Sequence, residues 1–128
     1  MSSKTILICD DTLTDRTNLE RIVRAAGYGV IFATSGGEAL ERAKALKPDL
    51  IFMDVNMEGM DGFAATRGLQ KDAATMRIPI VMVTSKGQKA DHVWARMQGA
   101  KGYVVKPYRD DQICAQLAAL LEKADAAG

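Results

Sequence analysis

Five short apolar runs, separated by longer segments with helical periodicity, place the strongest limit on how this chain can fold. The runs are rich in β-branched residues and lack polar alternation, which is typical of strands buried on both faces. They cover residues 6–9, 30–33, 50–53, 80–83 and 103–105. In the segments that follow each run, apolar residues recur every three or four positions, as on one face of an amphipathic helix. The chain is therefore expected to alternate five strands with five helices.

A strand–helix order that repeats in this way predicts a parallel sheet. Parallel strands need crossover connections, and right-handed crossovers place helices on both faces of the sheet. We expect a three-layer, doubly wound (βα)5 α/β domain with a flavodoxin-like fold and a five-stranded parallel sheet of order 2-1-3-4-5. With 128 residues, the chain is long enough for one such domain and its core. We interpret residues 1–128 as a single domain without an output domain.

The fourth helical segment has apolar residues at Ala90, Val93, Trp94 and Met97. Their spacing predicts that these side chains face the core. His92, the single histidine of the chain, falls between them, so we expect it to face solvent.

Composition and charge exclude several classes of function. Seventeen Lys and Arg residues against sixteen Asp and Glu residues give a net charge of +1, which does not support a nucleic-acid partner and favours a monomer. No apolar run approaches the ~18–20 residues that membrane insertion needs, and no signal peptide is visible. Cys9 and Cys114 are too few for a disulfide framework or a zinc cluster. We therefore expect a cytoplasmic protein.

Polar residues follow four of the five predicted strands. Asp10 and Asp11 come after the first strand, and the other three polar residues are Asp54, Thr84 and Lys106, after the third, fourth and fifth. In an open parallel sheet the functional crevice lies at the carboxyl ends of the strands. Each residue alone could be a helix cap or a surface group, but all five share one edge. This coincidence favours a functional site.

The residue types at this edge indicate phosphoryl transfer. Clustered carboxylates cannot all stay ionised without a counter-charge, and a hard cation with oxygen ligands, Mg²⁺ or Mn²⁺, supplies it. The backbone carbonyl of Asn56 could add a further oxygen. Lys106 could pair with Asp54 and then with an anion placed on it, and Thr84 offers a hydroxyl. Asp54 would be the attacking carboxylate.

From Thr5 to about Lys123 the chain resembles the CheY-like receiver domain of two-component response regulators, in its stand-alone form. The resemblance rests on the Asp10–Asp11 pair, Thr84, Lys106–Pro107 and the segment 54–62, which reads DVNMEGMDG. It implies that residues 1–128 form a single receiver domain. Asp54 would take a phosphoryl group from a histidine kinase or a histidine phosphotransfer domain.

The same resemblance implies a metal site and a cis peptide bond. Asp11 and Asp54, with the carbonyl of Asn56, would hold Mg²⁺, and Asp10 would act through metal-bound water. The peptide bond between Lys106 and Pro107 would be cis.

The resemblance also implies a switch. Thr84 would move toward the phosphoryl group, Tyr103 would rotate into the space left behind, and the surface of helix 4, strand 5 and helix 5 would bind a downstream protein. The chain departs from the family at Glu58, where Pro is usual. The segments 84–94 and 98–100 further resemble the PilH-type receivers that accompany type IV pilus twitching-motility systems.

Three other functions are alternatives to a phosphoacceptor role. A phosphatase of the haloacid dehalogenase kind also has an aspartate nucleophile, Mg²⁺, a hydroxyl and a lysine, but its nucleophile lies in an Asp-x-Asp pattern after strand one. A flavodoxin-like cofactor binder would need a phosphate-binding loop where Asp10 and Asp11 would repel phosphate. A receiver fold used only as a protein-binding scaffold would not need the acceptor site.

Overall fold

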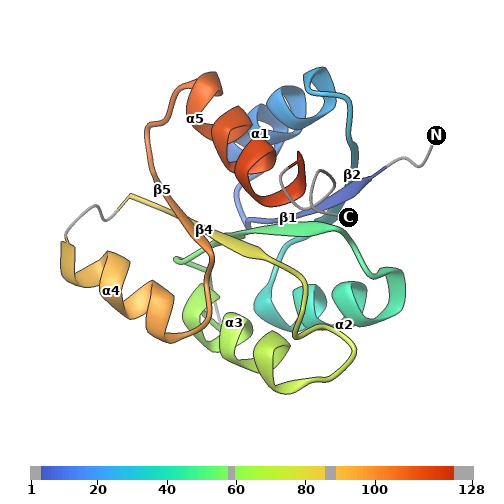
Figure 1. Cartoon of the computed structure of the whole chain (residues 1–128), viewed down its shortest axis with the longest axis vertical. Helices are drawn as coiled ribbons and strands as arrows, with labels where there is room; N and C mark the ends of the chain where they lie inside the picture. The colour runs from blue at the N-terminus through green and yellow to red at the C-terminus, as the bar shows by residue number, and fades with distance from the viewer. Residues whose placement is uncertain (1–3, 58–59, 86–88, 123–128) are drawn as a thin grey trace.

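The computed structural model describes residues 4–57, 60–85 and 89–122 as one three-layer domain (Figure 1). Its strands are β1 Thr5–Cys9, β2 Gly29–Ala33, β3 Leu50–Asp54, β4 Ile80–Thr84 and β5 Gly102–Val105. Its helices are α1 Leu13–Ala25, α2 Gly36–Leu46, α3 Gly62–Lys71, α4 Lys89–Met97 and α5 Asp110–Leu117, and a π-helical turn at Ala118–Glu122 continues α5. All strand pairs are parallel and their order is β2-β1-β3-β4-β5, which confirms the predicted fold.

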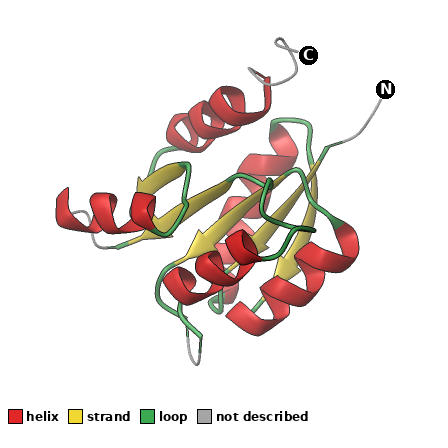
Figure 2. Cartoon of the chain, turned by 60° about the horizontal axis from the view of Figure 1, so that its bottom comes forward, coloured by secondary structure: helices red, strands yellow, loops and turns green. Residues whose placement is uncertain are grey.

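The helices divide between the two faces of the sheet. Helices α1 and α5 cover one face, and α2, α3 and α4 cover the other (Figures 1 and 2). Because successive side chains of a strand point to opposite faces, each strand contributes to two apolar clusters. In β3, Phe52 packs in the cluster under α1 and α5, while Ile51 and Met53 pack in the cluster on the opposite side.

Local chemistry explains where α2 and α3 begin. The Ser35 hydroxyl accepts a hydrogen bond of 3.1 Å from the Glu38 backbone N–H, and the Asp61 carboxylate accepts one of 2.8 Å from Ala64. Such caps satisfy backbone donors that the first helical turn leaves unpaired. The backbone N–H of Gly62 also bonds to the Val55 carbonyl at 3.0 Å, so helix α3 starts close to the carboxyl end of β3, where Asp54 lies.

The structure corrects the prediction for α4. Val93, Trp94 and Met97 are 53%, 46% and 70% exposed, whereas Ala95 is buried. His92 is half-buried and its ring lies 3.8 Å, centroid to centroid, from that of Tyr103. The side chain of Ala90 lies outside the described part of the chain. Apolar spacing identified an amphipathic helix but not the face that it turns to the sheet, because the residue that is buried in the core cluster is the small Ala95.

Among the described helices, none is long and apolar enough to cross a membrane. Both cysteines are free thiols.

Candidate functional site

Asp10, Asp11 and Asp54 come together at the carboxyl edge of the sheet. One carboxylate oxygen from each lies within 4.8 Å of those of the other two. Asp10 follows β1 and Asp54 ends β3, and these strands are neighbours, with Cys9 opposite Met53. Asp10 and Asp54 are buried, whereas Asp11 is exposed. The sequence-based expectation that these carboxylates converge is confirmed by this geometry.

The surroundings of Asp54 oppose its ionisation. Burial and the nearby Asp10 carboxylate raise its pKa to about 6, although Lys106 and a 3.3 Å hydrogen bond from the Asn56 backbone N–H act in the other direction. A buried carboxylate beside like charges is stabilised by an added cation. Asp54 is therefore a candidate ligand for a cation.

The donor set fits a hard divalent cation. The three clustered groups offer carboxylate oxygens, and neither histidine nor cysteine takes part in this group. Oxygen-only ligation is what Mg²⁺ prefers, and softer metals favour nitrogen or sulfur. Asn56 is exposed and follows Asp54, a member of this cluster, by two residues. Its backbone carbonyl is thus a further candidate oxygen.

Lys106 supplies the positive charge of the site. Its ammonium nitrogen lies 2.7 Å from Asp15, 3.1 Å from Asp10 and 3.8 Å from Asp54. Burial alone would lower the pKa of Lys106, but the hydrogen bond to Asp15 and the charges of Asp10 and Asp54 raise it to about 12. The ammonium thus stays protonated at neutral pH. The Lys106–Pro107 peptide bond is cis.

Sequence reasoning missed Asp15. It paired Lys106 with Asp54, whereas Asp15 and Asp10 hold the ammonium at shorter distances. Asp15 lies in the first turn of α1, not at a strand end, so the strand-end argument did not consider it. The available signal was an acidic residue one helical turn after Asp11, at the helix start that adjoins the site.

Thr84 and Tyr103 occupy neighbouring strands. Thr84 ends β4 and is buried, and Tyr103 lies on β5 opposite Met82. The ring of Tyr103 is half-buried and stacks on His92 of α4 with an interplanar angle of 35°. Tyr103 is thus placed between the end of the sheet that carries Thr84 and the surface of α4.

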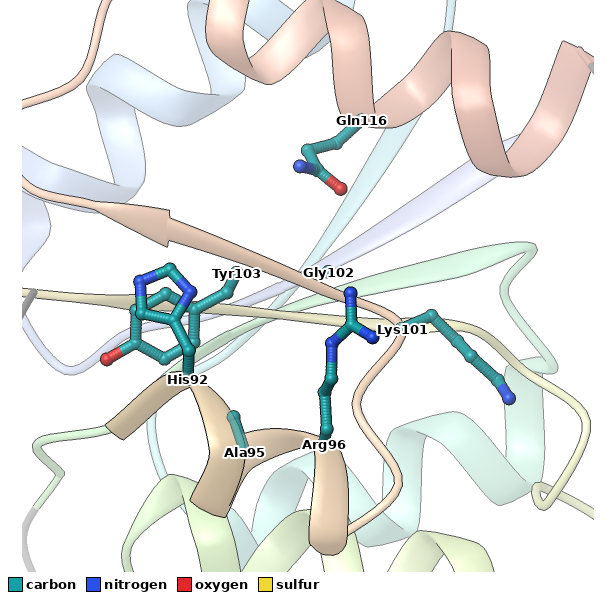
Figure 3. Close-up of a pocket in the computed structure, with 7 residues that line it drawn as sticks. All are labelled: His92, Ala95, Arg96, Lys101, Gly102, Tyr103 and Gln116. Atoms are coloured by element: carbon teal, nitrogen blue, oxygen red, sulfur yellow. The ribbon is translucent and has the colours of Figure 1, made fainter. Parts of the chain in front are cut away.

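A pocket of about 200 Å³ opens beside Tyr103, between α4, β5 and α5 (Figure 3). Figure 3 shows the His92 ring lying over Tyr103, and Arg96 reaching from α4 toward β5. Lys101 and Gln116 complete its polar lining. Among the residues that the structure describes, the lining carries basic side chains and no acidic one, which favours a negatively charged occupant.

The segments 58–59 and 86–88 are outside the described residues. They include Glu58, which departs from the usual Pro, and Lys86, which belongs to the segment that resembles the PilH-type receivers.

Comparison with known proteins gives one consistent family. Residues 6–118 match the response regulator receiver domain. The chain is 40% identical over 116 residues to protein PilH of Pseudomonas aeruginosa, covering 91% of this chain and 96% of PilH. Other curated relatives are transcriptional regulators, and the chain spans about half of their length.

Solved structures with the same fold agree with this result. Chemotaxis protein CheY4 of Vibrio cholerae superposes with a TM-score of 0.88 at 29% identity, covering 94% of this chain and 100% of CheY4. The receiver domain of the sensor histidine kinase PA1611 of Pseudomonas aeruginosa superposes with a TM-score of 0.87 at 26% identity, covering 94% of this chain and 99% of that domain. In that structure a magnesium ion is coordinated in the active site cleft.

Proposed function

Because this chain belongs to the response regulator receiver domain family, we propose that Asp54 accepts a phosphoryl group from a histidine kinase or a histidine phosphotransfer domain. Members of this family act in two-component signalling as phosphoacceptors and not as metabolic enzymes. Family membership sets aside the phosphatase and flavodoxin-like alternatives. The convergence of Asp10, Asp11 and Asp54 beside Lys106 is the observation that carries the proposal.

Asp11, Asp54 and the backbone carbonyl of Asn56 would hold Mg²⁺, with Asp10 completing the acidic set; Mn²⁺ has the same ligand preference. When bound, the cation neutralises the charge of the phosphoryl oxygens. The clustered carboxylate oxygens and the raised pKa of Asp54 support this assignment.

The transfer forms one bond and breaks one. An ionised oxygen of Asp54 attacks the phosphorus in line, the phosphorus–nitrogen bond of the phosphohistidine breaks, and the imidazole leaves with a proton. Lys106 and Thr84 would bind the phosphoryl oxygens, as an ammonium and a hydroxyl donor. Attack of water on the acyl phosphate later releases inorganic phosphate and restores the Asp54 carboxylate.

Phosphorylation would act on the surface of α4, β5 and α5. The phosphoryl group adds about −1.5 to −2 charges, and Thr84 would move to bond with it. Tyr103 would then leave its stack on His92 and rotate toward the space behind Thr84. A bias of about 1–3 kcal/mol between the two packings is sufficient for a useful switch.

The downstream partner would bind this surface with an acidic segment, because His92, Arg96 and Lys101 line the pocket beside Tyr103. We assign a single receiver domain that acts as a cytoplasmic monomer, without a nucleic-acid partner. The 40% identity to PilH supports a place in motility signalling of the type IV pilus or chemotaxis kind.

The test is incubation of the purified protein with acetyl phosphate and Mg²⁺, followed by intact-mass analysis. Wild type should gain one phosphoryl group, and the gain should disappear when EDTA removes the metal. Asp54→Asn should gain none, whereas the control Asp72→Asn, altered at an exposed carboxylate that pairs with Lys44, should match wild type. Unmodified wild-type protein at saturating acetyl phosphate would overturn the proposal, as would full modification of Asp54→Asn. Partner binding that is indifferent to phosphorylation would favour the scaffold alternative.

A further inference from the structure

The ammonium of Lys106 is held by a carboxylate that the phosphoacceptor site does not require. Its shortest contact is the 2.7 Å hydrogen bond to Asp15, while Asp54 lies beyond hydrogen-bond distance at 3.8 Å. The first turn of α1 supplies Asp15, so this contact joins α1 to the end of β5. Lys106 therefore rests closer to the helix than to the acceptor.

We propose that Asp15 is a positioning residue that restrains Lys106 and competes with the phosphoryl group on Asp54 for its ammonium. This inference rests on the proposed function, because it assigns a regulatory role within the same site. In the unmodified protein Lys106 donates to Asp15 and Asp10. After transfer it would donate to the phosphoryl oxygens and give up the bond to Asp15.

The exposure of the partners supports this direction of movement. The side chain of Asp15 is 41% exposed, against 7% for Asp54. Water can replace the ammonium at Asp15 when Lys106 leaves, whereas buried charges need a partner within the protein. Loss of the Asp15 contact is thus the less costly change.

An opening at this position gives the rearrangement room. A pocket of about 350 Å³ is lined by Asp15, Asn18, Ser85, Lys106 and the neighbouring Pro107 and Tyr108. The ammonium lies at the boundary between this pocket and the carboxylate cluster. A phosphodonor that approaches Asp54 from this side meets the negative charge of Asp15 as well as the ammonium that Asp15 restrains.

The test compares Asp15→Asn and Asp15→Ala with wild type. Asn keeps one acceptor oxygen without the charge, and Ala removes both, so the phosphorylation rate with acetyl phosphate and Mg²⁺ should rise in the order wild type, Asn, Ala. The affinity for beryllofluoride, a mimic of the bound phosphoryl group, should rise in parallel. A partly exposed ion pair corresponds to a gain of about two- to fivefold. Asp15→Glu should stay near wild type, and so should the control Asp111→Asn, altered at an exposed carboxylate that pairs with Arg109.

Two comparisons separate competition for Lys106 from simple repulsion of the donor. Acetyl phosphate carries more negative charge than phosphoramidate. Competition predicts a similar gain with both donors and in the beryllofluoride affinity. A gain limited to acetyl phosphate would overturn the proposal, as would an unchanged or lower rate in Asp15→Ala.

A double-variant cycle supplies the second comparison. If Asp15 acts through Lys106, Asp15→Asn should have no effect on beryllofluoride affinity in a Lys106→Met background. An equal gain in both backgrounds would contradict the proposal. Should Lys106→Met not bind the probe, the two-donor comparison decides. Failure of wild type to be phosphorylated would count against the proposed function, whereas wild-type phosphorylation with no gain in Asp15→Ala would count against this inference alone.

Discussion

At the scale of single residues, the site balances buried negative charge against one ammonium. Asp54 is buried beside Asp10, and both effects raise its pKa to about 6. A raised pKa in the folded state means that ionisation of Asp54 opposes folding at neutral pH. Under the proposed function, this cost to stability would accompany a carboxylate that is placed to bind a cation and accept a phosphoryl group.

Asp54→Asn should stabilise the metal-free protein at pH 7.5. Asn resembles the neutral acid, so it avoids the cost that appears as pH rises from about 3.8 through about 6. The expected gain is on the order of 1–3 kcal/mol in the free energy of unfolding. Urea unfolding with EDTA should show this gain at pH 7.5 and a smaller one at pH 5, because wild type is then largely protonated at Asp54.

Asp72→Asn provides a control of opposite sign. The Ala74 backbone N–H, and then Lys44, lower the pKa of Asp72, so its ionised form favours the folded state. Its neutralisation should therefore not stabilise the protein at pH 7.5. Equal stabilisation by both substitutions would contradict the electrostatic account of Asp54 and indicate a general effect of removing negative charge.

The sequence predicted the placement of some residues in the site and not of others. Asp10, Asp54 and Lys106 each lie at the carboxyl end of a strand, so topology alone brings them to one edge. Asp15 could not be found in this way, because its contact depends on the direction of α1 and on the reach of the Lys106 side chain. Which of several nearby carboxylates pairs with the Lys106 ammonium depends on side-chain packing. The positions of residues at strand ends do not determine that packing.

At the scale of elements, α3 is fixed tightly to the end of β3. The Gly62 backbone N–H donates a 3.0 Å hydrogen bond to the carbonyl of Val55, the residue directly after β3. A Cβ at Gly62 would collide with the Asp54 carbonyl oxygen and lie 2.9 Å from Val55 Cα. The missing side chain thus allows the helix to approach the strand that carries the acceptor.

Gly62→Ala should destabilise the protein by about 1–3 kcal/mol, because backbone must move to admit the methyl group. The shift should also slow phosphorylation of Asp54 by acetyl phosphate. Gly37→Ala in α2 is the matched control, since nothing lies within 4 Å of its Cβ position. There the change should be neutral or stabilising by up to about 1 kcal/mol. Urea unfolding checks both variants, and equal stability of the two would show that the close approach at Gly62 has no energetic importance.

Helix α4 shows a limit of periodicity as a guide. Its large apolar residues suggested a buried face, but the helix contacts the sheet through Ala95 and His92. Trp94 instead packs edge-on against Phe63 of α3, with ring centroids 6.2 Å apart. A small residue such as Ala95 carries a weak hydrophobic signal even where it is buried in the core.

Ala95→Leu should therefore cost about 1–3 kcal/mol through overpacking, whereas Met97→Gln should change stability by less than about 0.5 kcal/mol. Both variants are compared with wild type by urea unfolding in the same buffer. The reverse order, with Met97→Gln the more harmful, would mean that α4 turns its large apolar face inward.

At the scale of the whole molecule, the sheet order followed from sequence because uninterrupted apolar strands and intervening helices admit few parallel arrangements. That order makes β1 and β3 neighbours, with β4 next to β3 and β5 next to β4. Residues as distant as Asp10 and Lys106, 96 positions apart, thereby meet in one site. The carboxylates of this site thus come from the ends of β1 and β3, and its ammonium comes from the segment after β5.

Mg²⁺ should accordingly stabilise the entire domain and not one loop. At a concentration of about ten times Kd, a ligand that binds only the folded state adds about 1.4 kcal/mol to the free energy of unfolding. Asp11→Asn is the discriminating variant, because Asp11 is exposed and its loss removes a ligand without leaving a cavity. Thermal unfolding with and without Mg²⁺ should show a shift in wild type and in Asp111→Asn, and little shift in Asp11→Asn. An equal shift in all three proteins would place the stabilising cation elsewhere, because binding at the edge shared by β1 and β3 requires the Asp11 carboxylate.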